Sequence, residues 1–262
     1  GPSGLDVCRR DGGVDLREHG LEGDHHLVGR ELLPRVEREA SIQDGEGHEL
    51  LLPLLVGGEL GSCRMRKHLL DSLSCIKALD ISNAEKKLKV IDIGTGAGFP
   101  LLPLWFFFPQ WKITLVDSVN KKLEFIKHFT NLATENFSNL KKENIEIVHS
   151  RAEDLAKSKS YRENFDLCIS RAVAKLVSLS ELCMPFIKIN GTFIAMKGPD
   201  IDEEIKEAKK VIILLGRKID SIVKFELLNT GLNRAIISVK KIKKTNSDFP
   251  RKPGMAQKAP II

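Results

Sequence analysis

The chain has 262 residues, enough for one domain of usual size with an appendage, and no apolar run reaches the ~20 residues that span a bilayer. Its five cysteines are odd in number and lack a C-x-x-C pair, which argues against a disulfide framework or a zinc site and favours a reducing cytoplasm. The net charge of +6 divides into −5 for residues 1–66 and +11 for the remainder, so only the larger part suits a polyanion.

Residues 1–62 differ in composition from the rest of the chain. They contain no Lys, Asn, Thr, Phe, Tyr or Trp, whereas Gly, Leu, Glu, Arg and His are abundant. Repeated glycines interrupt any long periodicity, so we expect partial disorder in this segment. A fusion, a misassembled gene model or a frame-shifted start would each explain the change. The predicted division of the chain is 1–62, a main domain at 63–240 and a basic tail at 241–262.

An amphipathic helix is predicted to begin near Arg66. Its apolar face holds Leu69, Leu73 and Ile76. His68 and Asp71 are three residues apart and therefore lie close together on this helix. Taken alone, His68 is typical of a surface or capping histidine.

A glycine-rich turn follows the first predicted strand, residues 89–93, and a helix is predicted from Pro100. The turn reads D-x-G-x-G-x-G, in which the acid is Asp92 and the glycines are Gly94, Gly96 and Gly98. Such glycines indicate a ligand-binding loop, because a Cβ would collide with a ligand lying across the turn. The acid would repel a dinucleotide's pyrophosphate but can pair with an ammonium group. We therefore predict S-adenosylmethionine as the ligand; the alternative is an ordinary tight turn.

A second acid supports this interpretation. Residues 112–117 form a short β-branched strand that ends in Asp117, close to the ~20-residue separation that places a carboxylate on a ribose diol. The alternative for Asp117 is an acid that favours the start of the next helix.

Strands and helices alternate along the rest of the main domain. The predicted strands are 145–149, 165–170, 191–197, 219–227 and 234–240, and the predicted helices are about 120–134, 175–187 and 201–215, the last with an acidic start. This order indicates a mostly parallel sheet with helices on both faces. The last two strands have no helix between them, which predicts a hairpin and an antiparallel edge.

The basic tail follows the last strand. Residues 240–262 hold seven basic residues and one acid, with prolines that keep the segment extended. A solvated tail and a segment that contacts phosphates are both compatible with this pattern.

Seven motifs together resemble those of the RsmG family, also called glucose-inhibited division protein B, in the family's order over residues 66–262. They are His68-Leu69-Leu70-Asp71-Ser72-Leu73, Asp92-Ile93-Gly94-Thr95-Gly96-Ala97-Gly98-Phe99-Pro100, Leu115-Val116-Asp117-Ser118, Ser150-Arg151-Ala152-Glu153-Asp154, Ser170-Arg171-Ala172-Val173-Ala174, Met196-Lys197-Gly198 and Pro250-Arg251-Lys252-Pro253-Gly254. The combination is specific, although no single motif is. Family members usually carry an N-terminal helical region with a Trp and an Asn-Leu-Thr stretch, and this chain has neither.

The resemblance implies a Rossmann-like class I S-adenosylmethionine-dependent methyltransferase that methylates N7 of a guanosine in bacterial 16S ribosomal RNA. It implies that Gly94 and Phe99 line the cofactor, that Ala152 and Glu153 flank the adenine, and that Arg171 closes the site. We expect a cytoplasmic monomer without a metal ion, whose partner is 16S ribosomal RNA or the small ribosomal subunit.

The chemistry of such a reaction needs few catalytic groups. Guanine N7 has a lone pair and no proton to lose, so attack on the sulfonium methyl requires positioning and electrostatics rather than a general base. Our hypothesis is that Arg171 and Lys197 orient the nucleotide or its phosphate, with His68 a weaker candidate; Arg171 could instead form a structural ion pair. The competing functions are a small-molecule methyltransferase with the same cofactor and a non-catalytic RNA-binding protein that retains the fold.

Overall fold

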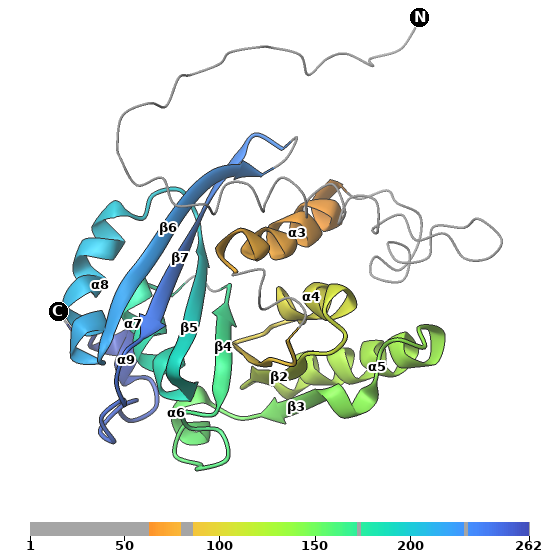
Figure 1. The fold of residues 1–262 in the computed structure, drawn as a ribbon, viewed down its shortest axis with the longest axis horizontal. Helices are drawn as coiled ribbons and strands as arrows, with labels where there is room; N and C mark the ends of the chain where they lie inside the picture. The colour runs from red at the N-terminus through yellow and green to blue at the C-terminus, as the bar shows by residue number, and fades with distance from the viewer. Residues whose placement is uncertain (1–62, 80–85, 172–173, 228–229, 262) are drawn as a thin grey trace, which may run out of the picture.

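The computed structural model describes residues 63–79, 86–171, 174–227 and 230–261, so the expectations for residues 1–62 lie outside the described part. It contains one seven-stranded sheet in the order β3-β2-β1-β4-β5-β7-β6 (Figure 1). The strands are β1 Lys89–Ile93, β2 Lys112–Asp117, β3 Ile145–His149, β4 Phe165–Ser170, β5 Ile187–Lys197, β6 Arg217–Leu227 and β7 Leu232–Lys241. The first five in the sheet are parallel, and β7 is antiparallel to both of its neighbours. The predicted mostly parallel sheet with an antiparallel edge hairpin is confirmed.

Helices cover both faces of the sheet (Figure 1). They are α3 Cys63–Leu73, α4 Leu101–Phe107 and α5 Asn120–Asn136 on one face, and α6 Ala152–Leu155, α7 Leu176–Cys183 and α8 Asp202–Leu214 on the other. Neighbouring residues of β1 show why two cores form: Val90 packs under α4, whereas Ile91 packs with α7. Both side chains are fully buried, because successive residues of a strand face opposite sides of the sheet.

Two predicted helices end earlier than their apolar patterns. α3 stops at Leu73 and continues as a 3₁₀ turn at Ser74–Ala78, in which Ile76 still packs against the core. The helix predicted at 175–187 is α7 followed by a 3₁₀ turn at Met184–Phe186, and β5 begins at once at Ile187. Pro185 explains the second break, because proline has no amide hydrogen with which to continue a helix.

The segment after β7 folds back along the molecule instead of extending from it. Lys241 is buried, and its ammonium group lies 2.6 Å from a carboxylate oxygen of Glu163. The Arg162 guanidinium donates hydrogen bonds to the carbonyl oxygens of Asn246 and Phe249, at 2.9 and 2.8 Å. A last short helix, α9 at Met255–Lys258, then lies beside α7 (Figure 1).

Candidate functional site

The glycine turn joins β1 to α4. The amides of Gly94 and Thr95 both donate to the carbonyl oxygen of Val116 on the adjacent strand, at 2.9 and 3.0 Å. Gly98 has a φ of +92°, and a Cβ there would lie 2.2 Å from the Leu102 side chain, so the approach of α4 requires glycine. At Gly94, with a φ of +75°, a Cβ would meet no atom of the described chain within 4 Å. The first part of the turn therefore leaves open space in which a ligand can lie.

Asp117, at the end of β2, ties this turn to the start of α5. One carboxylate oxygen accepts the amide hydrogen of Gly96 at 2.9 Å, and the other accepts that of Val119 at 2.9 Å. Lys122 approaches the same carboxylate at 3.5 Å. The structure thus gives Asp117 the helix-start role that was its alternative in the sequence. Its oxygens retain lone pairs, and its binding of a ribose stays a prediction.

Asp92 is a buried acid without a charged partner among the described residues. Its exposed fraction is 0%, and neither carboxylate oxygen accepts a hydrogen bond of standard geometry from the residues that the structure describes. Among these residues, the buried Thr95 hydroxyl is the one side chain whose hydrogen bonding lowers the pKa of this group. Burial raises the pKa of this carboxyl group to about 8. A buried polar group normally has a partner, and the ammonium group of S-adenosylmethionine would supply one here. The residues of the turn therefore fit the predicted cofactor.

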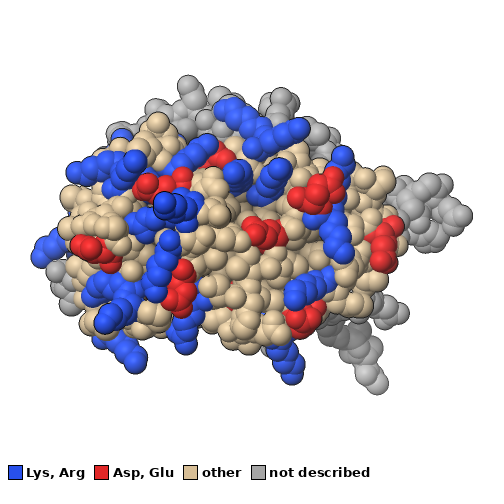
Figure 2. Space-filling model, turned by 90° about the horizontal axis from the view of Figure 1, so that it is seen from below, with Lys and Arg blue, Asp and Glu red and all other residues tan. Residues whose placement is uncertain are grey.

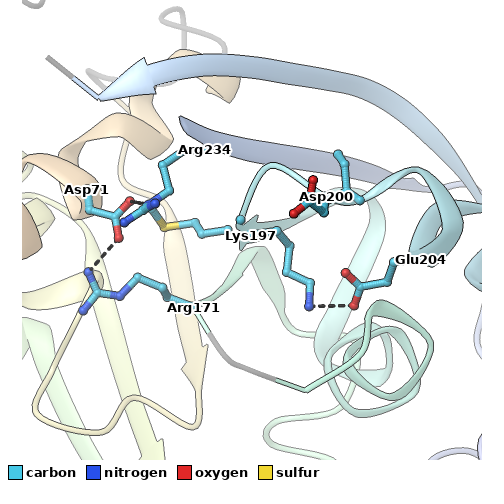
Figure 3. Close-up of a pocket in the computed structure, with 9 residues that line it drawn as sticks. Asp71, Arg171, Lys197, Asp200, Glu204 and Arg234 are labelled. Carbon is cyan, nitrogen blue, oxygen red and sulfur yellow. Dashed lines mark hydrogen bonds and ion pairs between the residues drawn. The ribbon is translucent and has the colours of Figure 1, made fainter. Parts of the chain in front are cut away.

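A pocket of about 310 Å³ lies around Arg171, the residue that directly follows β4 (Figure 3). Its lining is Asp71, Arg171, Met196, Lys197, Gly198, Asp200, Ile201, Glu204 and Arg234. These residues come from α3, from the ends of β4 and β5, from the start of α8 and from β7. Most of them follow the carboxyl ends of parallel strands, where ligands bind in open α/β sheets.

One carboxylate holds two guanidinium groups at this pocket. Asp71 lies 2.9 Å from Nε of Arg234 and 3.4 Å from Nη1 of Arg171 (Figure 3). Arg171 also donates to the carbonyl oxygen of His68 and the hydroxyl of Ser72, each at 3.2 Å. The side chain of Arg171 is therefore fixed by α3, which matches both hypotheses for it: an ion pair at a strand end and a cation at the site.

Lys197 is held by a different set of contacts. Its exposed fraction is 8%, and its ammonium group lies 2.7 Å from a carboxylate oxygen of Glu204 and 2.7 Å from the carbonyl oxygen of Ala174 (Figure 3). The same Glu204 oxygen accepts the amide hydrogen of Leu176 at 2.5 Å, which fixes the start of α7. The Lys197 ammonium group therefore lies at the pocket, where the Glu204 carboxylate already pairs with its charge.

Phe99 connects the turn to this pocket. The Arg171 guanidinium lies 5.1 Å from the centre of the Phe99 ring, within the range of a cation–π contact. The His68 ring lies on the same aromatic side chain, with ring centres 6.0 Å apart. His68, Phe99 and Arg171, which are distant in the sequence, therefore come together, and Lys197 shares the pocket with Arg171.

Comparisons with known proteins show the family of the chain. The family model for rRNA small subunit methyltransferase G matches residues 62–247. The Ribosomal RNA small subunit methyltransferase G of Clostridium perfringens strain SM101 is 45% identical over 197 residues, which are 75% of this chain and 78% of that protein. The protein of the same name from Desulforamulus reducens is 46% identical over 195 residues, 74% of this chain and 77% of that protein.

The chain belongs to the rRNA small subunit methyltransferase G family. The predicted resemblance, the class I fold and S-adenosylmethionine as methyl donor are thereby confirmed. Among solved structures, the 16S rRNA (adenine(1408)-N(1))-methyltransferase from Catenulisporales acidiphilia aligns with a TM-score of 0.49 and 12% identity, over 63% of this chain and 95% of that chain.

The segment predicted to flank the adenine in this family member lies one strand beyond Asp117. Asp117 is paired with His149 across β2 and β3, and α6 begins three residues later with Ala152 and Glu153, both buried. The Glu153 carboxylate accepts the amide hydrogen of Gly254 at 2.8 Å. It therefore serves the C-terminal segment, and the position of the adenine stays a prediction.

Sequence reasoning missed several residues of the family member's pocket. Arg234 stands at the start of a buried strand, and a charge in that position was the available signal. Asp200 and Glu204 belong to the stretch that was interpreted as the acidic start of α8. Among the described residues, no group of three or more His, Cys, Asp or Glu could hold a metal ion. No helix in the described part has the length and apolarity to cross a bilayer.

Proposed function

We propose that this family member transfers the methyl group of S-adenosylmethionine to N7 of a guanosine in 16S ribosomal RNA. The observation that carries the proposal is the buried Asp92 carboxyl, which has no charged partner among the described residues and begins a glycine turn that Phe99 connects to a pocket of mixed charge. Guanine presents an O6 acceptor and an N2 amino donor. Arg171 and Arg234 offer donors for the acceptor and for phosphate, and Asp200 offers an acceptor for the amino group.

The roles of the chain's own residues follow from the chemistry. S-adenosylmethionine, when bound, supplies a methyl group on a positively charged sulfur. Asp92 would hold the ammonium group of the cofactor, and the glycine turn would let the cofactor approach the backbone closely. Arg171, Lys197 and His68 would orient the nucleotide. A nucleophile with a lone pair and no proton needs no general base, and the ion pairs of Asp71 and Glu204 are consistent with structural rather than basic roles.

The charge of the main domain supports an RNA substrate. Residues 67–262 carry a net charge of +11. Figure 2 shows one face of the molecule, on which Lys and Arg side chains are widespread and Asp and Glu are fewer. Contacts between lysines and phosphates supply affinity that does not depend on sequence. Recognition of one guanosine is then left to the pocket.

We further propose that the protein acts as a cytoplasmic monomer. Cys75, Cys168 and Cys183 are buried free thiols, which suits a reducing compartment. Analytical ultracentrifugation of the full chain should give a single species of about 29.3 kDa. A dimer at micromolar concentration would contradict the monomer.

The deciding experiment is incubation of the full chain, and of residues 63–262, with labelled S-adenosylmethionine and bacterial small-subunit RNA, as naked RNA and as assembled particles. We expect label in RNA, and digestion with mass spectrometry should place it on N7-methylguanosine. Methyl transfer to a small molecule without RNA would favour the small-molecule enzyme. Absence of cofactor binding by calorimetry would favour the non-catalytic RNA-binding protein.

A further inference from the structure

The C-terminal segment grips a buried acid of α7. We call residues 249–258 the C-terminal clasp. Glu181 has an exposed fraction of 1%, and both of its carboxylate oxygens are engaged by Arg251. One oxygen accepts the backbone amide and Nε of Arg251, each at 2.9 Å, and the other accepts Nη2 at 2.7 Å. This two-pronged pairing fixes both the side chain and the backbone of the clasp.

The clasp also reaches α6. The amide of Gly254 donates to the Glu153 carboxylate at 2.8 Å, and Glu153 has an exposed fraction of 7%. Two residues later, the carbonyl oxygen of Ala256 accepts the Ser178 hydroxyl of α7 at 2.6 Å. The clasp therefore bridges α6 and α7, and it does so with Gly254 in the left-handed region, at a φ of +81°.

Helix α6 depends on such a bridge. It spans only Ala152–Leu155, one turn, and a single turn of helix has little stability of its own because nucleation is costly. Its position must come from packing and from anchors such as the hydrogen bond of Glu153. If the clasp were released, the buried Glu153 carboxylate would lose the Gly254 amide hydrogen and would have to find another partner. Release of the clasp should therefore be accompanied by a movement of α6.

We propose that the C-terminal clasp is a positioning device for cofactor binding, in which Gly254, acting through Glu153, holds α6 where it flanks the adenine. The inference rests on the proposed function, because it assumes that the adenine of the cofactor lies beside Ala152 and Glu153. It assigns a second role to a segment whose sequence suggested RNA contact. Arg251 and Gly254 are positioning residues here, since neither one touches the cofactor in this scheme.

The first test uses Gly254→Ala, which strains the left-handed backbone of the clasp without altering Glu153. We expect the Kd for S-adenosylmethionine, measured by calorimetry, to rise by about tenfold or more, because the site is no longer preorganised. The KM for the cofactor should rise with it, while kcat at saturating cofactor changes little. The matched control is Gly231→Ala in the β6–β7 turn, which has a similar φ of +66° and similarly open surroundings.

A second pair of variants tests Glu153 directly. Glu153→Gln keeps an oxygen that can accept the Gly254 amide hydrogen, so it should raise the Kd less than Glu153→Ala does. Glu153→Ala removes the acceptor and should raise the Kd as Gly254→Ala does. Asp154→Ala is the control on the same helix, because Asp154 is exposed and pairs only with Lys157 among the described residues.

Hydrogen exchange tests the inference on the unaltered protein. Coupling between two sites is reciprocal, so saturating S-adenosylmethionine should slow amide exchange in residues 249–258 several-fold. If the cofactor binds but neither exchange in the clasp nor the Kd of Gly254→Ala changes, the clasp is only a structural feature and the inference is overturned. If the unaltered chain binds no cofactor, the proposed function fails together with it.

Discussion

At the scale of single residues, Asp92 is a site residue whose burial costs the fold stability. Its carboxyl group is buried, and it accepts no hydrogen bond of standard geometry from the described residues. Burial has the largest effect on its pKa and raises it, whereas Thr95 and Arg171 lower the pKa and Asp117 raises it, and no cation pairs with Asp92 in the described part. Buried polar groups without partners are rare, because desolvation is not repaid. The function proposed for Asp92 supplies the missing partner only when the cofactor binds.

This state of Asp92 predicts a pH dependence of stability. Its pKa is about 8 in the folded protein, against an ordinary value of 3.8. As the pH rises from about 4 to about 8, the unfolded carboxyl ionises while the folded one stays protonated, so the unfolded state becomes favoured. Asp92→Asn should therefore exceed the unaltered chain in unfolding free energy by about 1 kcal/mol or more at pH 8, and by less at pH 5. Urea unfolding at both pH values measures this difference.

The same substitution should abolish cofactor binding in calorimetry, because an amide cannot pair with an ammonium group as a carboxylate does. An Asp92→Asn protein that bound S-adenosylmethionine normally would remove Asp92 from the site. Equal slopes of stability against pH for the two proteins would contradict the raised pKa.

Substitution of Arg171 should reduce methyl transfer more than it reduces the stability of the fold. Arg171→Ala loses contacts with His68, Asp71 and Ser72, but Asp71 keeps Arg234 at 2.9 Å. The cost in unfolding free energy should therefore stay near 1 kcal/mol, as for one partly exposed set of hydrogen bonds. Methyl transfer should fall by about 100-fold, because the nucleotide loses an orienting cation.

Methyl transfer and thermal denaturation of the same Arg171→Ala sample distinguish the two hypotheses for this residue. Lys206→Ala serves as the control, since Lys206 forms an exposed ion pair on α8. If the loss of methyl transfer is fully explained by the smaller fraction of folded protein, Arg171 forms only a structural ion pair.

At the scale of elements, the glycine turn combines two different requirements. Gly98 needs its missing side chain because Leu102 of α4 occupies the space, whereas Gly94 faces open space. Gly98→Ala should destabilise the fold by about 2 kcal/mol, through steric overlap and a strained φ. Gly94→Ala should cost about 1 kcal/mol, yet its methyl group should weaken cofactor binding.

Denaturation and cofactor calorimetry on both glycine variants measure these effects. Gly231→Ala again provides a matched left-handed glycine, here outside the turn, and should leave cofactor affinity unchanged. Equal cofactor affinity for Gly94→Ala and the unaltered chain would show that the cofactor does not lie across the turn.

The elements that the sequence predicted correctly are those with local signals. β1 and β2 are β-branched runs next to turn residues, and their bounds match the predictions at 89–93 and 112–117. The pocket had no such signal, because Asp71 and Arg234 are 163 residues apart in the sequence. They meet only because β7 returns antiparallel beside β5 and α3 covers that end of the sheet. Such a long-range pair depends on the order of the strands in the sheet and on where α3 packs, and neither follows from composition or spacing.

At the scale of the whole molecule, the C-terminal segment carries both structural and exposed charges. Lys241 and Arg251 are paired with acids inside the fold, so they serve folding. Lys244, Lys252 and Lys258 are exposed and remain available to phosphates. Deleting residues 241–262 would therefore remove buried contacts together with surface charge, and a loss of RNA binding could not be assigned to either one.

Substitution of the exposed lysines isolates the electrostatic part. The triple variant Lys244→Gln, Lys252→Gln and Lys258→Gln should weaken RNA binding and reduce the slope of log K against log salt by roughly 2 to 3, since each of the three phosphate contacts contributes about 0.7 to 0.9. Fluorescence titration of small-subunit RNA between low and physiological salt measures the slope.

The control for this experiment removes equal charge from the opposite end of the sheet. Lys121, Lys127 and Lys142 are exposed on α5 and the turn before β3, which lie far from α9 in Figure 1. Replacing all three by Gln lowers the net charge by the same amount as the first triple variant does, so both variants change the overall electrostatic attraction of the protein for RNA equally. A smaller slope change in this control places the RNA backbone along the C-terminal segment. An equal change in both variants would mean that RNA responds to total charge alone, and an unchanged slope in the first would exclude the segment from the RNA-binding surface.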